Sequence, residues 1–243
     1  MIAIGNTKIT KAYLGSTELK NIAIGDELLL SKASPYDEYG YIAAGKVFHV
    51  DGINKGNDST KWTDIVGGYT FPYNTHTTLA DNGVVFDGKK GSYIVSETNL
   101  NANTWKPDVC TIECVFDITS GRCHFSSGEN TNIIFSIGND VFVFYPSSSS
   151  NKAWTTTCIT GKNTVSLSDD YGYQNGTSLV ATTSDSWNQG SKKMSLGGRS
   201  YGSANSIIGT LHCVRIYNRK LTVAEILNNQ QVDNTRFNLG LTI

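Results

Sequence analysis

Short runs of alternating apolar and polar residues recur along the chain from Lys46 onward, with turn-forming residues between them. In the clearest run, residues 110–118, every second residue is apolar. A period of two is typical of a strand with one buried face. The dipeptides Asp51-Gly52 and Asp87-Gly88 end two further runs and favour tight turns. Many short strands at intervals of about ten residues predict an all-β sandwich rather than an α/β fold.

The composition supports a β-rich protein and narrows the choice of partners. The 243 residues include 24 Gly and only 4 Pro, 17% are charged, and the net charge is -1. Proteins that bind nucleic acid depend on a basic surplus, so we expect no nucleic-acid partner. No run approaches the roughly twenty apolar residues of a membrane span, so we expect no membrane partner. The five cysteines lack metal-like spacing, and Cys110 and Cys114 are expected to be small core residues.

The first thirty residues contain a threefold repeat. Each unit has a glycine followed by Asn, Ser or Asp, and the glycines are Gly5, Gly15 and Gly25. Such a pair favours a tight turn, so each unit is predicted to be strand, turn, strand. Thirty residues bury too little apolar surface to be stable alone. We predict an attachment or oligomerisation element at 1–30, a linker at 31–45 and the main domain at 46–243; a β-meander docked on that domain is the alternative.

These repeats resemble the short glycine-punctuated repeats at the start of many bacteriophage tail and capsid-fibre proteins. The resemblance implies that the element anchors the chain to a phage particle. The first residues also lack the basic segment and apolar core of a signal peptide. We therefore expect a protein that is folded in a reducing host cytoplasm and assembled into a virion.

One helix is predicted near the end of the sequence. Thr222 and Glu225 have the spacing of a capping box. Four residues then share one face of the helix: Val223, Ile226, Leu227 and Gln230. The helix should end near Asp233.

The run from Ile208 to Ile226 contains the pattern Arg-Ile-Tyr-Asn-Arg-x-Leu-Thr-x-x-Glu-Ile. It resembles the closing strands of laminin-G-like, concanavalin A-like domains, and the resemblance extends over about residues 45–235. It implies a jelly-roll sandwich of two antiparallel sheets, with ligand bound on the concave sheet or at rim loops. The expected fold is thus an all-β, concanavalin A-like sandwich with one short C-terminal helix, preceded by a small β-repeat element. Within the run, Arg215 is expected to pair with a carboxylate and Tyr217 to fill the core.

Catalytic patterns are weak in this sequence. Glycan hydrolases of similar architecture need two carboxylates facing one cleft. The nearest approach is Glu113 and Asp117, but Val115 stands where a middle acid would be expected. The histidines are scattered, and the sequence has neither a Gly-x-Ser-x-Gly elbow nor a phosphate-binding loop. We expect a protein that is not an enzyme.

One loop has the oxygen donors that calcium prefers: Asp51, Asn57 and Asp58. Lys55 lies among them, however, and the spacing is not that of an EF-hand. Our preferred interpretation is a solvated turn, with Ca²⁺ as the alternative. No other cofactor is expected.

The most plausible binding surface lies between Tyr145 and Tyr201, a loop-rich stretch in which aromatic residues stand among small polar ones. Aromatic rings stack on the C–H faces of sugars, and a few polar groups bind the hydroxyls. The predicted ligand-binding residues are Trp154, Tyr171, Tyr173, Trp187 and Tyr201. In the alternative interpretation, Trp154 and Trp187 fill the core of the sandwich.

These features predict a non-catalytic bacteriophage protein of a tail or capsid fibre or decoration, which displays a lectin-like domain toward the host. Its partners would be other virion proteins, a host surface glycan and copies of itself, as a trimer in preference to other states. Two alternatives remain open. One is a purely structural decoration protein without ligand, and the other is a glycoside hydrolase, or its accessory carbohydrate-binding module, from a gut bacterium.

Overall fold

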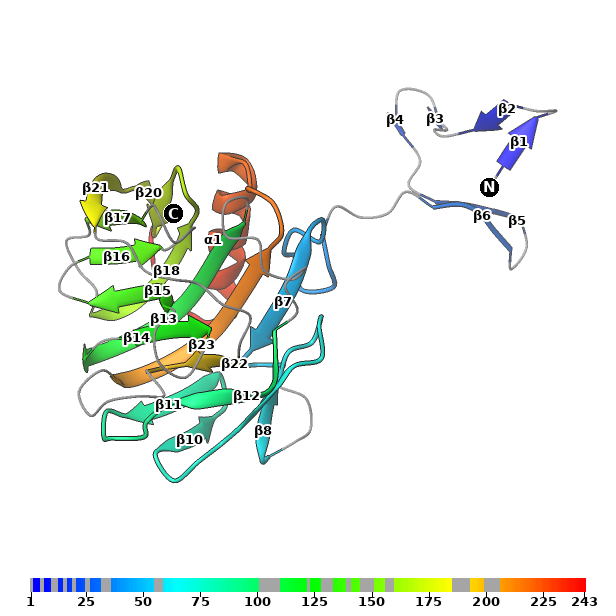
Figure 1. Ribbon diagram of the computed structural model, residues 1–243. Coiled ribbons are helices and arrows are strands. Elements are labelled where there is room, and N and C mark those ends of the chain that lie inside the picture. The colour runs from blue at the N-terminus through cyan, green and yellow to red at the C-terminus, as the bar shows by residue number, and fades with distance from the viewer. Residues whose placement is uncertain are drawn as a thin grey trace.

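The alternating run that begins at Thr111 forms one of two long central strands in the computed structural model (Figure 1). β13 (Thr111–Gly121) and β23 (Ile207–Tyr217) are each 11 residues long and pair antiparallel. The first contains most of the alternating run at residues 110–118, and the second lies in the run from Ile208 that resembles closing strands, so both expectations are confirmed. The structure describes residues 36–54, 59–100, 110–121, 154–155, 160–181, 193–198 and 206–243, and elsewhere only the backbone of the strands named below.

Two antiparallel sheets form the sandwich. The eight-stranded sheet has the order β10-β11-β23-β13-β18-β19-β20, and β7 also pairs with β23. Its other strands are β7 (Lys46–Asp51), β10 (Thr77–Ala80), β11 (Gly83–Asp87), β18 (Gly161–Leu167), β19 (Gly172–Gln174) and β20 (Thr177–Ser178). The seven-stranded sheet has the order β12-β22-β14-β15-β16-β17-β21. It consists of β12 (Ile94–Asn99), β14 (Cys123–Ser127), β15 (Ile133–Gly138), β16 (Val141–Phe144), β17 (Asn151–Thr155), β21 (Val180–Ser184) and β22 (Lys193–Leu196). A separate pair is formed by β8 (Lys61–Thr63) and β9 (Thr70–Pro72).

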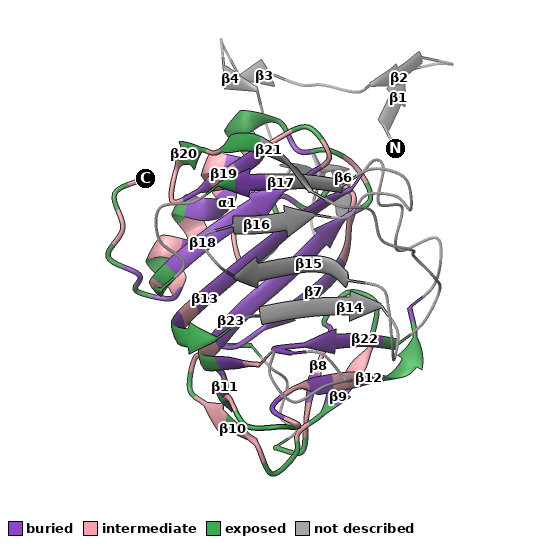
Figure 2. Cartoon of the chain, turned by 60° about the vertical axis from the view of Figure 1, so that its left-hand side comes forward, coloured by how far each residue is buried: buried purple, intermediate pink, exposed green. Residues whose placement is uncertain are grey.

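The apolar core lies between the two sheets. Ile112, Cys114 and Phe116 reach it from β13, and Met194 and Leu196 reach it from β22. All five are at most 1% exposed, and Figure 2 shows buried residues running along β13, β18 and β23. The described cysteines are free and buried, as expected of small core residues.

The opposite face of the eight-stranded sheet is covered by the helix α1 (Val223–Arg236), which lies outside the sandwich (Figure 1). The predicted capping box is present: the Thr222 hydroxyl accepts the Glu225 N–H, and the Glu225 carboxylate accepts the Thr222 N–H. The helix runs three residues past the predicted end. Its buried residues are Ile226, Asn229, Gln230 and Asp233, at helical spacing. The predicted apolar face is therefore wrong at Val223, which is 50% exposed in the first turn. Three of the four buried residues are polar, because the sheet presents polar groups to α1. Among the described residues, no helix is both long and apolar enough to cross a membrane.

The contact between α1 and the sheet is centred on a buried guanidinium. Arg215 of β23 donates from Nε to Glu113 of β13 at 2.9 Å and from both terminal nitrogens to Asp233 of α1 at 2.7 and 2.8 Å. The ring of Tyr41 lies 3.9 Å from the guanidinium carbon, and its hydroxyl donates to Asp233 at 2.8 Å. Burial raises the pKa of the Glu113 carboxyl, while Arg215 opposes the shift. The predictions that Arg215 pairs with a carboxylate and that Tyr217 is buried are confirmed.

The three N-terminal repeats each form an antiparallel strand pair, as predicted. The pairs are β1 (Ile2–Ile4) with β2 (Thr7–Ile9), β3 (Tyr13–Leu14) with β4 (Thr17–Glu18), and β5 (Asn21–Ile24) with β6 (Glu27–Ser31). Each pair is a two-stranded sheet of its own. The turn glycines Gly5, Gly15 and Gly25 lie outside the described residues. The packed domain begins earlier than the predicted linker boundary at residue 45, because Tyr41 and Ile42 are buried against the α1 side of the sheet.

Replacing Arg215 with Leu should lower the free energy of unfolding by about 3–5 kcal/mol, because Glu113 and Asp233 would stay buried without a counter-charge. The matched control is Arg219→Leu, which removes a half-exposed ion pair with Glu225 and should lower it by less than about 1 kcal/mol. Urea denaturation of both variants measures the difference. Equal losses in the two variants would contradict this assignment of the buried cluster.

Candidate functional site

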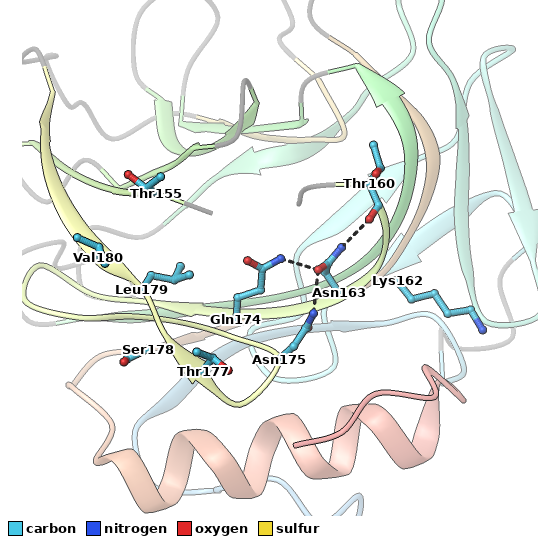
Figure 3. Close-up of a pocket in the computed structure, with 10 residues that line it drawn as sticks. All are labelled: Thr155, Thr160, Lys162, Asn163, Gln174, Asn175, Thr177, Ser178, Leu179 and Val180. Atoms are coloured by element: carbon cyan, nitrogen blue, oxygen red, sulfur yellow. Dashed lines mark hydrogen bonds between the residues drawn. The ribbon is translucent and has the colours of Figure 1, made fainter. Parts of the chain in front are cut away.

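A hollow of about 480 Å³ opens at the edge of the sandwich, beside strands of both sheets (Figure 3). The chain passes from the eight-stranded to the seven-stranded sheet here, as β20 ends at Ser178 and β21 begins at Val180. The lining residues are Thr155, Thr160, Lys162, Asn163, Gln174, Asn175, Thr177, Ser178, Leu179 and Val180. The hollow is thus formed by the hairpin β19–β20, its neighbour β18 with the preceding Thr160, the last residue of β17 and the first residue of β21.

The hairpin at the base of the hollow has a two-residue Asn-Gly turn. Asn175 has a φ of 51° and Gly176 a φ of 81°, and Gln174 pairs with Thr177 across the turn. Positive φ at both central residues is the geometry of a type I′ turn, which favours Asn-Gly because it matches the twist of the strands. The dipeptide in the sequence therefore accounts for the position of this turn.

Three amide side chains meet on the floor of the hollow (Figure 3). The Asn163 carbonyl accepts from Gln174 at 2.6 Å and from Asn175 at 3.0 Å. The Asn163 NH₂ group donates to the backbone carbonyls of Thr160 and Gly161. Because both ends of Asn163 are occupied and the residue is 2% exposed, it acts as a fixed support for its two neighbours.

The rim of the hollow is a mixture of hydroxyl and apolar groups. Thr177 and Ser178 are exposed, and the Val180 side chain beyond them is 74% exposed. Lys162 is the one charged residue among the described residues of the lining, and its ammonium group donates to the Asn238 carbonyl at 2.9 Å. A lining of neutral donors and acceptors beside apolar carbon is suited to a ligand that carries hydroxyl groups on a C–H framework.

Trp154 is not part of an exposed aromatic surface. Its side chain is 1% exposed and belongs to the core between the sheets. The ring lies on Gly172, where an added Cβ would be only 2.6 Å from two of its atoms. This placement corrects the expectation that Trp154 stacks on a ligand, and it agrees with the alternative that the residue fills the core.

Tyr171 and Tyr173 lie on the other side of the eight-stranded sheet, next to α1. Both pack against the cluster around Tyr217 and Ile226, and their rings are 6.2 Å apart. The Tyr171 hydroxyl accepts the Leu221 N–H at 3.0 Å, and burial raises the pKa of Tyr171 to about 12. Both residues support the helix rather than form a sugar platform with Trp154. Trp187 and Tyr201 lie outside the described residues.

The predicted calcium loop contains a carboxylate that already has partners. Asp51 is fully buried; one oxygen accepts the Ile53 and Asn54 N–H groups, and the other accepts from Arg236 at 2.5 Å. Although burial opposes ionisation, the His49 ring, whose Nε2 lies 3.5 Å from the carboxylate, and the hydrogen bond from the Asn54 N–H lower the pKa of Asp51 to about 2. Asp51 is therefore not a free calcium ligand, because both of its oxygens already have partners, while Ile53 and Asn54 after it are exposed. Asn57 and Asp58 lie outside the described residues.

No group of three or more His, Cys, Asp or Glu side chains that could hold a metal occurs within the described ranges. The carboxylate considered for catalysis, Glu113, lies beneath α1. It accepts hydrogen bonds from Ser166, Arg215 and Asn229, and none of its surface is exposed. The two-carboxylate pattern on β13 therefore does not face the hollow.

The residues that form the hollow were absent from the predicted site. A signal for them existed in Gln174-Asn175-Gly176, because Asn-Gly indicates a hairpin turn and the flanking amides had to lie at its base. The contribution of Asn163 could not be found in this way. Its contact with Gln174 depends on the pairing of β18 with β19.

The sequence matches no family model and no curated protein. The structure is similar to that of a Trypanosoma rangeli sialidase in complex with sialic acid, with a TM-score of 0.56 and 16% identity over 79% of this chain and 33% of the sialidase chain. It is also similar to a structure of botulinum neurotoxin type C, whose cell entry depends on interaction with two ganglioside molecules. Here the TM-score is 0.57, with 13% identity over 76% of this chain and 51% of the toxin chain.

The fold is a concanavalin A-like jelly roll. The match spans about a third of the sialidase chain and half of the toxin chain, so the likeness concerns only a part of each. At these identities it shows the fold alone.

The stability of the fold should depend on pH through His49, whose ring is fully buried between Tyr39 and Tyr41. Burial lowers the pKa of His49 to about 4, against 6.5 for the unfolded chain. The unfolded state therefore binds more protons between these values, and the free energy of unfolding should fall as the pH drops from 6.5 to 4, by on the order of 3 kcal/mol. His49→Phe should flatten this part of the curve in urea denaturation at a series of pH values. An unchanged slope would show that His49 is not the group responsible.

Proposed function

We propose that this chain is a non-catalytic carbohydrate-binding protein and that the edge hollow is its sugar site. The proposal rests on the lining of the hollow, in which amide and hydroxyl groups from the β19–β20 hairpin lie beside the exposed Val180. Sugars present hydroxyls around a ring of C–H groups, so they match a site with both kinds of surface. The site replaces the aromatic surface expected from the sequence.

Binding without hydrolysis is supported by the charges around the hollow. Glycoside hydrolysis needs two carboxyl groups on either side of the scissile bond. The described residues of the lining include none, and the carboxylate of Glu113 is engaged with Arg215 on the far side of the sheet. Sugar binding is compatible with the similar structures, because one is a sialidase in complex with sialic acid and the other is a toxin that interacts with ganglioside molecules.

We further propose that the protein belongs to a bacteriophage virion and displays this domain toward a host surface glycan. Its N-terminal strand pairs would attach it to other virion proteins or join copies of the chain, with a trimer as the expected state. Support comes from the glycine-punctuated repeats and from the small size of each strand pair, which needs a partner for stability. Several copies would raise the avidity of a weak single site.

A glycan array of bacterial surface polysaccharides tests the sugar site. The full chain should bind at least one glycan, and Val180→Glu at the rim should weaken binding by roughly tenfold or more, equivalent to about 1.4 kcal/mol. Val223→Glu is the matched control, because this valine is also exposed but lies on the first turn of α1. Equal binding by both variants would exclude the hollow as the site. If the unaltered chain binds no host polysaccharide, the structural decoration protein is favoured. New reducing ends after incubation of the chain with host polysaccharide would favour a hydrolase.

The attachment element can be tested by measuring mass in solution. The full chain should form a homo-oligomer, predicted to be a trimer, whereas a chain that starts at residue 32, after β6, should be a monomer. This starting point keeps Tyr41 and Ile42, which pack on the sandwich. Light scattering of both proteins at equal concentration gives the answer. Monomers in both cases would contradict self-association, and attachment to a particle would then be the remaining form of the proposal.

A further inference from the structure

The turn at the base of the hollow is held from the opposite side of the sheet. Gln230 of α1 is fully buried, and its side-chain oxygen accepts the Gly176 N–H at 2.7 Å. In a two-residue hairpin turn, strand pairing supplies no partner for the N–H of the second central residue. The helix therefore provides the acceptor for a backbone N–H that strand pairing leaves without a partner.

Gln230 is itself held in one orientation. Its NH₂ group donates to the Ser166 hydroxyl at 3.2 Å and to the Tyr173 carbonyl at 3.4 Å. Ser166 in turn donates to Glu113, the partner of Arg215. The amide of Gln230 thus belongs to the buried network that fixes α1 on the sheet, and its oxygen is aimed at the turn.

A second connection joins the same helix to the other residue of the turn. Asp233 accepts from the Thr164 hydroxyl at 2.7 Å. The Thr164 backbone exchanges two hydrogen bonds with Asn175: its N–H donates to the Asn175 side-chain oxygen at 2.9 Å, and its carbonyl accepts the Asn175 N–H at 3.0 Å. Asn175 then donates to Asn163 on the floor of the hollow.

We infer that Gln230 is a positioning residue for the hollow: through Gly176 it fixes the Asn175–Gly176 turn and so sets where the amides of Gln174 and Asn175 lie. The inference rests on the proposed function as far as ligand binding is concerned. The inference goes beyond the proposed function because it assigns a role in affinity to a helix residue that does not contact the ligand. Alternation of side chains along β18 and β19 allows this, since Thr164 and Tyr173 face the helix while Asn163 and Gln174 face the hollow.

Hydrogen exchange of the Gly176 amide tests the positioning role in the full chain, independently of any glycan. In the unaltered protein this amide should exchange as slowly as strand amides of β18, although the turn is at the surface. In Gln230→Met, which keeps the length of the side chain but removes the acceptor, its exchange should become faster by more than the change in global stability explains. The matched control is Asn229→Leu, which removes the neighbouring buried amide of α1 without touching the turn. In this control, the exchange rate of the Gly176 amide should change only as much as the global stability of the protein does.

Affinity for the strongest glycan of the array provides the second readout. The dissociation constant should rise about fivefold in Gln230→Met, because the turn loses one hydrogen bond that keeps it in the binding position. In Asn229→Leu the dissociation constant should stay within about twofold. Fast exchange of Gly176 in the unaltered chain overturns the positioning role, even if the Gln230 variant does not fold. Faster exchange with an unchanged dissociation constant overturns the link to binding. If the unaltered chain binds no glycan, the proposed function fails, while the exchange result still decides whether Gln230 positions the turn.

Discussion

The interaction on which the rest of this structure depends is the buried guanidinium of Arg215. A charge without access to water is stable only when carboxylates neutralise it with good geometry, and here Glu113 and Asp233 do so from two different elements. This requirement fixes α1 against β13 and β23. Because Gln230 and Asp233 lie on the buried face of that helix, the same requirement determines where the hairpin at the edge of the sandwich is held.

Local signals in the sequence predicted a large part of the fold. Alternation identified β13, the resemblance of the run from Ile208 to closing strands indicated β23, and Thr222 with Glu225 identified the start of α1. Arg215 was correctly expected to have a carboxylate partner. These successes share a physical reason: periodicity and capping depend on residues that are close in sequence. The polar face of α1 was missed because the sequence pattern alone does not show that the sheet offers it charged and amide groups.

The predicted site failed where it depended on contacts between distant residues. Trp154 and Tyr173 are both aromatic and stand among polar residues, yet they lie on opposite sides of the eight-stranded sheet. Trp154 reaches Gly172 from β17 of the other sheet, whereas Tyr173 of β19 packs toward α1. Asp51 had the chemistry of a calcium ligand, but its partner Arg236 is supplied by the last turn of the helix. Neither arrangement can be derived without the pairing of strands and the position of α1.

The central claim is that the amide-lined hollow at the sandwich edge is a sugar site. The most direct test is a nuclear magnetic resonance titration of the full chain with oligosaccharides from host capsule, following the side-chain NH₂ signals. The account predicts that the signals of Gln174 and Asn175 move in a saturable way, together with the backbone signals of Thr177 and Ser178. Saturable shifts confined to other parts of the chain, with these signals unmoved, would contradict it.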